Sequence, residues 1–271
     1  MREMRIEGHN DCVKGLGQAC FFLPKKGNTE DEYEDAFHLS ATSNSDSQRY
    51  RFAVADGATE TSFSGQWAKL LVNAFVSGDF DRGIHASSLE PLRRQWAEKV
   101  TSKDLPWYGE EKIRQGAYSS LLGLQLIQKG TRLTWEATAI GDSCLFHLRG
   151  RRLLTTFPIE HSADFDSRPL LLSSKPSESD LPLESVKQLA GDFDSADVFF
   201  LMTDALACWF LGRHEAGEEP WRALVDLAAE DQRHAFSDFI CRLRALGEIR
   251  NDDVTLLRVE AFDFSAGKAN D

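Results

Sequence analysis

The stretch FFLMTDALACWF, residues 199–210, places one acid, Asp204, in a run that is otherwise almost entirely apolar. The residues before the acid have the composition of a buried strand, expected over 197–203, and those after it read as a turn into packing residues. A buried carboxylate needs a cation, a hydrogen-bond donor or a proton beside it, because an unpaired charge is very costly to bury. We therefore expect a core strand that ends on an acid with a specific partner.

Strand and helix patterns occur in blocks along the rest of the chain. Strands are expected at 17–23, 36–41, 50–55, 132–140, 144–149, 151–156 and 253–260, and helices at 63–77, 88–102, 109–129, 219–230 and 233–246. The helices at 88–102 and 109–129 would form an antiparallel pair joined by a turn at Pro106, and 157–197 reads as a long surface loop with a short strand or two.

Few strands alternate singly with helices, which disfavours a doubly wound parallel sheet. The order predicts an α+β fold: a four-layer α-β-β-α sandwich in which two antiparallel sheets are flanked by antiparallel helix pairs. We expect a single domain over residues 1–271, with a short flexible C-terminal tail.

Composition narrows the function. The 271 residues carry a net charge of −12 with a pI near 5.1, which argues against binding to nucleic acid or to an anionic membrane surface. No apolar run reaches the length of a membrane span, and the N-terminus lacks the apolar core of a secretory signal. Five cysteines without C-x-x-C spacing indicate reduced thiols, so a cytoplasmic protein is expected.

Acids recur at the ends of the predicted strands. Asp56 and Asp204 follow strands, whereas Asp35 and the pair Asp252–Asp253 precede them. In an antiparallel sheet the end of one strand lies beside the start of its neighbour, so these acids can meet at one rim. Converging carboxylates need cations or protons at neutral pH, and oxygen ligands without His or Cys suit Mg²⁺ or Mn²⁺.

Five short motifs in this order resemble those of the metal-dependent Ser/Thr protein phosphatases, the type 2C or PPM family. They are EDAF (34–37), VADG (54–57), GDS (141–143), MTDA (202–205) and DDVT (252–255), and the match extends over about residues 10–260. DGATETSFSGQWAKLL (56–71) looks most like the bacterial branch, and FPIEHS (157–162) is similar to the D-H-S strand exit of the family.

The resemblance implies two Mn²⁺ or Mg²⁺ ions at one edge of the sandwich. Asp56 would bridge both ions, the Gly57 carbonyl would complete one of them, and Asp204 and Asp252 would ligate the first ion. Glu34 and Asp35 would hold the second ion, largely through water, and Asp142 matches an acid of a weaker third metal site. The residues expected to carry catalysis are Asp56, Asp204 and Asp252.

The implied reaction is hydrolysis of phosphoserine or phosphothreonine by a metal-activated water, with no phospho-enzyme intermediate. Three positions depart from the family pattern: Glu30 stands where a basic residue often grips the phosphate, Ala58 replaces a His of eukaryotic members, and Cys208 replaces a second acid. Lys25 or Lys26 is the alternative candidate for the phosphate grip. A lone loop His161 is read as ordinary surface.

Three functions remain open at this stage: an active phosphoprotein phosphatase, a catalytically weak phosphatase-like regulatory or binding module, and a hydrolase of small phosphorylated molecules. The retained acids favour the first. A phosphorylated protein is the expected substrate, and the resemblance also implies a cognate Ser/Thr kinase and a von Willebrand A-like protein as partners.

Overall fold

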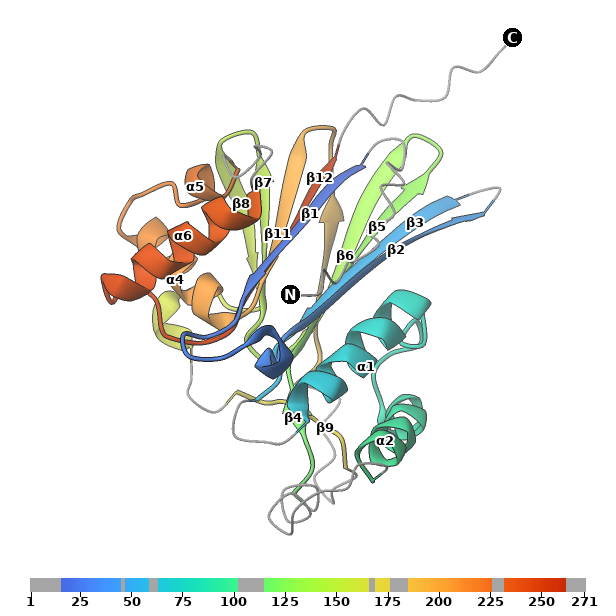
Figure 1. Ribbon diagram of the computed structural model, residues 1–271. Coiled ribbons are helices and arrows are strands. Elements are labelled where there is room, and N and C mark those ends of the chain that lie inside the picture. The colour runs from blue at the N-terminus through green and yellow to red at the C-terminus, as the bar shows by residue number, and fades with distance from the viewer. Residues whose placement is uncertain are drawn as a thin grey trace.

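The computed structural model describes residues 16–44, 47–58, 63–101, 115–165, 169–175, 185–225 and 232–261. Within them, two five-stranded antiparallel sheets face each other (Figure 1). Sheet A has the order β1 (Leu16–Leu23), β12 (Val254–Ala261), β11 (Asp197–Met202), β7 (Cys144–Arg149), β8 (Arg152–Phe157). Sheet B has the order β10 (Lys187–Asp192), β6 (Arg132–Ile140), β5 (Leu121–Lys129), β3 (Ser47–Ala55), β2 (Ala36–Asn44).

Helices cover the outer face of each sheet. The helices α4 (Asp204–Glu215), α5 (Trp221–Val225) and α6 (Gln232–Ala245) lie against sheet A, whereas α1 (Ser64–Ser77) and α2 (Ala86–Thr101) lie on the side of sheet B (Figure 1). Two 3-10 turns, η1 (Glu30–Glu32) and η2 (Ser162–Asp164), and the short pair β4 (Tyr118–Ser119) and β9 (Leu172–Ser173) complete the described elements.

Three apolar clusters separate the four layers. The cluster between the sheets includes Phe52, Leu124 and Phe199. A second cluster packs Phe146 of sheet A against Phe210 of α4, and a third packs Trp67 beneath sheet B. Because each sheet is apolar on both faces, it needs a helical layer outside and the other sheet inside. The predicted four-layer α+β sandwich is confirmed.

The prediction of a helix over 109–129 is wrong for its described part. Residues 121–129 form β5, a central strand of sheet B, in which Leu122, Leu124 and Leu126 face the other sheet. On the opposite face, a Cβ placed on Gly123 would lie 2.1 Å from the ring of Phe75 in α1. The strand therefore presents a glycine where a helix crosses closely. Residues 102–114, with the turn expected at Pro106, lie outside the described residues, as does the tail beyond 261.

A second correction concerns the opening stretch. Residues 204–215 form α4, so Asp204 is the first residue of a helix and not of a turn. Its helix pattern is hidden because apolar residues surround the axis on nearly all sides. The described part of 157–197 holds two short strands, β9 and β10, as expected for this segment, and β10 extends sheet B.

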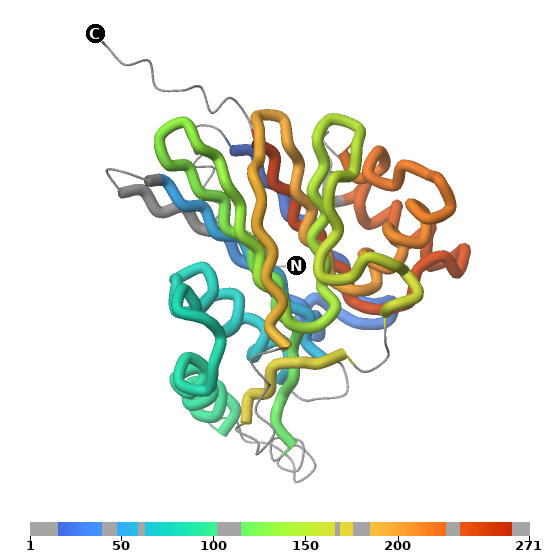
Figure 2. The backbone as a smooth tube through the Cα atoms, turned by 180° about the vertical axis from the view of Figure 1, so that it is seen from behind, coloured from blue at the N-terminus to red at the C-terminus, as the bar shows by residue number. Residues whose placement is uncertain are grey.

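The hairpins β5–β6 and β7–β8 turn at the same end of the sandwich (Figure 2). The turn between β6 and β7 and the exits of β3 and β11 therefore lie at the opposite end. Antiparallel connection thus gathers the motif-bearing ends of both sheets at one rim.

Candidate metal centre

Two predicted ligands come from neighbouring strands of sheet B. Asp35 immediately precedes β2, and Asp56 immediately follows β3. Ala36 pairs with Ala55 across these strands, so the two acids lie beside each other at the rim. Asp35 is fully buried, whereas Asp56 is half-buried.

Three further predicted ligands come from sheet A. Asp142 lies in the turn before β7, Asp204 follows β11, and Asp252 lies just before β12. The registers bring them together, because Met202 at the end of β11 pairs with Cys144 on one side and with Leu256 on the other. Asp142 and Asp204 are buried and Asp252 is half-buried.

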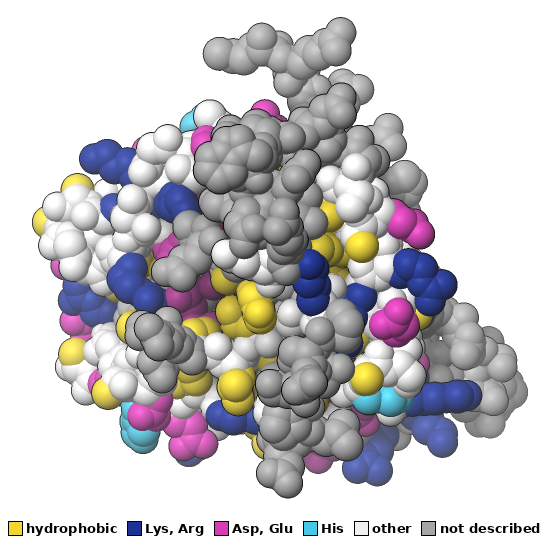
Figure 3. Space-filling model, turned by 90° about the horizontal axis from the view of Figure 1, so that it is seen from below, with side chains coloured by type: hydrophobic (Ala, Val, Ile, Leu, Met, Phe, Trp, Pro, Cys, Tyr) yellow, Lys and Arg dark blue, Asp and Glu magenta, His cyan; other side chains and the backbone are white. Residues whose placement is uncertain are grey.

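The acids of the two sheets act on one another through space. Burial raises the pKa of Asp56 well above its ordinary value, and the negative charges of Asp35, Asp204, Asp142 and Asp252 raise it further. Such effects require short distances in a poorly screened environment. The strand registers therefore place these five acids at one rim, within electrostatic range of one another. Seen from this end, acidic side chains gather in a recess near the middle of the face (Figure 3).

Asp35 links the sheets directly. Its Oδ2 accepts a hydrogen bond of 2.6 Å from Thr255 Oγ1 on β12, and the hydroxyl of Tyr33 bonds to the same Thr255 oxygen. Its Oδ1 is buried and has no hydrogen-bond partner among the described residues. Burial raises the pKa of Asp35 well above its ordinary value, against the lowering effect of the Thr255 bond. An orphaned buried carboxylate oxygen is what a missing cation or water would leave behind.

Two serines fix the backbone at Asp56. Its N–H donates to Ser120 Oγ at 2.9 Å, and the Ser120 N–H donates back to the carbonyl of Asp56 at 2.9 Å. Ser120 Oγ in turn lies 2.8 Å from Ser143 Oγ in the GDS motif. Motifs from β3 and from the β6–β7 turn are thus tied together behind the carboxylate.

Gly57 sits where no side chain fits. A Cβ at this position would lie 2.6 Å from the carbonyl oxygen of Glu34 and 2.9 Å from the carbonyl carbon of Ser64. The Glu34 carboxylate accepts a hydrogen bond of 2.6 Å from Ser64 Oγ and lies 3.8 Å from Lys25 Nζ. The glycine therefore allows the Glu34 segment to approach the exit of β3 closely.

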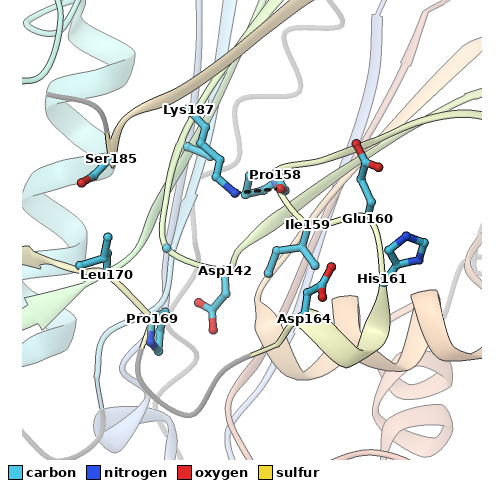
Figure 4. Close-up of a pocket in the computed structure, with 12 residues that line it drawn as sticks. Asp142, Pro158, Ile159, Glu160, His161, Asp164, Pro169, Leu170, Ser185 and Lys187 are labelled. Carbon is cyan, nitrogen blue, oxygen red and sulfur yellow. Dashed lines mark hydrogen bonds between the residues drawn. The ribbon is translucent and has the colours of Figure 1, made fainter. Parts of the chain in front are cut away.

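Asp142 borders an open pocket. Gly141, at φ +92°, turns the chain closely over Ser120, so that a Cβ added to Gly141 would lie 2.7 Å from the Cβ of Ser120. Burial and the charge of Asp204 raise the pKa of Asp142 to about 7. The adjacent pocket, about 460 Å³, is lined by Pro158, Ile159, Leu170 and Lys187 among others (Figure 4).

Asp204 has a cationic partner. Its Oδ2 accepts a hydrogen bond of 2.5 Å from Nη2 of Arg250, and its Oδ1 accepts one of 2.5 Å from the Ala205 N–H. Burial raises the pKa of Asp204, against the lowering effect of Arg250. The half-buried Cys208, which stands in place of a second acid, directs its thiol toward the carbonyl of Ser162 at 3.9 Å.

Asp253 holds the loop that carries the first motif. Its two carboxylate oxygens accept hydrogen bonds of 2.7 Å from the backbone N–H of Lys25 and from that of Glu34. Both oxygens are therefore engaged by the protein, which leaves the half-buried Asp252 as the acid of this pair with the freer carboxylate. Sequence reasoning did not find this role, since adjacent acids before a strand look alike.

Glu30 and His161 lie on the surface. Glu30 is exposed in η1, and the His161 imidazole is exposed, 3.5 Å from a carboxylate oxygen of Glu215. Ala58 directly follows Gly57, and its N–H donates to the carbonyl of Tyr118 at 3.0 Å. The residue that sequence reasoning missed is Arg250. Its signal in the sequence was its position two residues before Asp252, but only the folded chain reveals its contact with Asp204, 46 residues away.

A divalent cation suits this donor set in its chemistry. The rim supplies carboxylate oxygens, the ligands that Mg²⁺ and Mn²⁺ prefer, together with the orphaned oxygen of Asp35. Within the described part of the chain, however, no three Asp, Glu, His or Cys side chains are grouped closely enough to form a complete metal cage. Arg250 occupies the Asp204 oxygen that a cation would need.

The fold and the rim together define a class of protein. The sandwich of two antiparallel sheets between helical layers has the fold of PP2C-type bacterial serine/threonine phosphatases whose structures have been solved. A scan against protein-family models and a search of curated proteins each found no match.

Three solved structures carry this comparison. A bacterial serine phosphatase has a TM-score of 0.58 at 12% identity, covering 92% of this chain and 100% of that one. The phosphatase PstP of Mycobacterium tuberculosis has a TM-score of 0.51 at 17% identity, covering 92% and 99%. The PP2C domain of SpoIIE from Bacillus subtilis has a TM-score of 0.52 at 13% identity, covering 91% and 63%. PstP has also been solved with two manganese ions.

Proposed function

We propose that this protein is a metal-dependent protein-serine/threonine phosphatase. The observation that carries the proposal is the meeting of strand ends from both sheets at one rim, which places four other acids within electrostatic range of Asp56. Acids gathered in this way repel one another unless protons or cations compensate them. Their positions correspond to the motifs by which the sequence resembles the PP2C family, and the fold agrees with that resemblance.

In this proposal Asp56, Asp204 and Asp252 would hold one divalent ion, and Asp56 would also help to hold a second. Glu34, Asp35 and the Gly57 carbonyl complete the site, and Asp142 contributes to a weaker third one. Two such ions supply a water of lowered pKa as the nucleophile and offset charge on the phosphoryl oxygens. Mn²⁺ and Mg²⁺ are the candidates, and the PstP structure with two manganese ions supports this choice.

The protein's own residues provide the framework for this chemistry. The Ser120–Ser143 pair and the Asp253 carboxylate fix the backbone next to the proposed ligands, so that the acids keep their positions during the reaction. Ser120, Ser143 and Asp253 thus help to orient the proposed ligands. No nucleophilic side chain is required, because water attacks phosphorus directly.

The pocket beside Asp142 supports a phosphoprotein substrate. Its apolar residues Pro158, Ile159 and Leu170 and the ammonium of Lys187 offer contacts to residues that flank a phosphorylated side chain (Figure 4). A cognate Ser/Thr kinase would create that substrate, as the family resemblance implies. Among the described residues, no helix has the length and apolar character needed to cross a bilayer.

The test measures hydrolysis of p-nitrophenyl phosphate and of a phosphothreonine peptide with Mn²⁺, with EDTA, and with the variant Asp204→Asn. We expect activity that EDTA abolishes and that the variant lowers by at least about 100-fold, because an electrostatic ligand to the reacting centre is lost. Asp192→Asn, an exposed acid on β10, is the matched control and should keep full activity.

Activity that survives both EDTA and Asp204→Asn would refute the di-metal mechanism. If the protein binds Mn²⁺ but hydrolyses neither substrate, the regulatory or binding module is the correct function instead. Hydrolysis of p-nitrophenyl phosphate without hydrolysis of phosphopeptides would indicate a small phosphorylated substrate.

A further inference from the structure

The side chain of Arg250 reaches the acids of the rim. The Arg250 guanidinium donates to Asp204 Oδ2 at 2.5 Å, while 52% of its side-chain surface remains exposed to solvent. Its positive charge also acts on Asp142 and Asp252, so it lies within electrostatic range of both. An arginine that touches the reacting centre and is also open to solvent can meet an incoming ligand.

Arg250 also borders the open surface next to the rim. It lines a cavity beside α4, of about 570 Å³, together with Ala205, Cys208 and Ser162. The Arg250 guanidinium therefore lies between the acids of the rim and the cavity beside α4. Among the described residues the Arg250 guanidinium makes one hydrogen bond, to Asp204, and a guanidinium offers five N–H donors.

Two other cations lie near the acids in the described part of the chain. The Lys25 ammonium faces Glu34, another proposed metal ligand, but at 3.8 Å from its carboxylate, which is beyond hydrogen-bond distance. Arg244 donates to the backbone carbonyls of Pro24 and Asp252 at 2.9 Å and 2.5 Å, so it braces the backbone. Of these three cations, Arg250 is the one that donates a hydrogen bond to the carboxylate of a proposed metal ligand.

We propose that Arg250 binds the phosphoryl group of the substrate, and that it pairs with Asp204 only while no cation does. When Asp204 holds a cation, the Arg250 guanidinium would lose this carboxylate as its hydrogen-bond partner. The released fork remains beside the rim, where it donates to the oxygens of a phosphate monoester. A planar guanidinium matches two phosphate oxygens at once, which a lysine ammonium does not.

This inference rests on the proposed function, and it assigns the role that Glu30 leaves vacant. The family often has a basic phosphate-binding residue before the EDAF motif. Here an arginine just before the DDVT motif would take that role, because the EDAF and DDVT motifs lie at the same rim in the folded chain. It offers an alternative to the sequence-based choice of Lys25 or Lys26, which the variant Lys25→Gln tests below.

The experiment compares Arg250→Gln, Arg250→Lys and two matched controls that each remove one charge. Arg213→Gln lines the same cavity, but its guanidinium pairs with Glu218 and Glu248, away from the rim. Lys25→Gln tests the sequence-based candidate. Calorimetry measures the binding of inorganic phosphate to the Mn²⁺-loaded protein and of Mn²⁺ to the metal-free protein, and steady-state kinetics give KM and kcat for p-nitrophenyl phosphate.

For Arg250→Gln we expect phosphate binding to weaken at least about tenfold, because a charge-assisted pair of hydrogen bonds is lost. KM should rise by a similar factor, and Mn²⁺ should bind the metal-free variant more tightly than it binds the wild type, because its competitor for Asp204 is gone. The phosphate affinity and KM of Arg250→Lys should lie between those of Arg250→Gln and the wild type, and those of Arg213→Gln should match the wild type.

Unchanged phosphate affinity and KM in Arg250→Gln would overturn the inference, as would an equal loss in Arg213→Gln or a larger loss in Lys25→Gln. These outcomes leave the proposed function intact if the wild type still hydrolyses phosphopeptides with Mn²⁺. A wild type that binds neither Mn²⁺ nor phosphate would instead overturn both proposals. Circular dichroism of each variant verifies folding, and Arg250→Lys carries the comparison if Arg250→Gln does not fold.

Discussion

Replacing Gly57 by Ala tests whether the rim depends on the close approach of two backbone segments. The added Cβ would lie 2.6 Å from the Glu34 carbonyl oxygen, 2.9 Å from the Ser64 carbonyl carbon and 3.0 Å from its Cβ. Ordinary contact begins near 3.4 Å, so the Glu34 carbonyl must move by about 0.8 Å. Its freedom to move is small, because Asp253 holds its N–H and Ser64 holds its carboxylate.

Overpacking of this kind costs about 1–3 kcal/mol, and the shifted segment carries two proposed ligands. We therefore expect Gly57→Ala to lower the free energy of unfolding by that amount and to weaken Mn²⁺ binding. Urea unfolding in EDTA, followed by tryptophan fluorescence, measures the first effect, and calorimetry with Mn²⁺ measures the second.

The matched control is Gly212→Ala in α4. There a new Cβ meets only Ser162 atoms at 3.8 Å, an ordinary contact. Alanine should stabilise this helix by up to about 1 kcal/mol relative to glycine. The two substitutions should thus shift stability in opposite directions. A Gly57→Ala protein as stable as the wild type, with unchanged Mn²⁺ affinity, would refute the reasoning.

Two further substitutions test the framework and its response to pH. Asp253→Ala leaves the backbone N–H groups of Lys25 and Glu34 without acceptors, so we expect a loss of about 2–5 kcal/mol in urea unfolding and weaker Mn²⁺ binding; a loss below about 1 kcal/mol would contradict the assigned role. Burial lowers the pKa of His147 below its ordinary 6.5, although its hydrogen bond to Asp197 opposes this shift. As the pH falls below 6.5, the unfolded chain therefore binds a proton that the native chain does not, and the free energy of unfolding decreases. In thermal melts with EDTA, His147→Gln should lose less stability than the wild type between about pH 7.5 and about pH 5.5, and equal losses would count against this assignment.

The sequence was sufficient where local pattern and fold agree. The strands 132–140 and 144–149 have the predicted bounds, because alternating apolar residues meet glycine-containing turns at both ends. The acids at strand ends also predicted the rim, since antiparallel pairing leaves few other places for them.

The sequence was not sufficient to identify an element where its apolar residues fit both the helix period and the strand period. LLGLQLIQK, the sequence of β5, has apolar residues at spacings that satisfy both a helix and a strand, and only the neighbours β3 and β6 decide between them. Gly123 in its middle was the available signal, because a glycine inside a strand often marks a close approach. Arg250 offered no comparable signal, since its partner Asp204 is distant in the sequence.

Hydrogen bonds within the protein hold the rim. Asp56 is fixed through Ser120, Asp35 through Thr255, and the Glu34 segment through Asp253. In domains whose fold depends on a metal, the binding energy of the ion is also folding energy. Here we expect the two energies to be separate, because three apolar clusters stabilise the sandwich and hydrogen bonds position the acids. Removing the cation should therefore abolish the reaction and spare the fold, which is why EDTA and the rim substitutions can distinguish catalysis from stability in this protein.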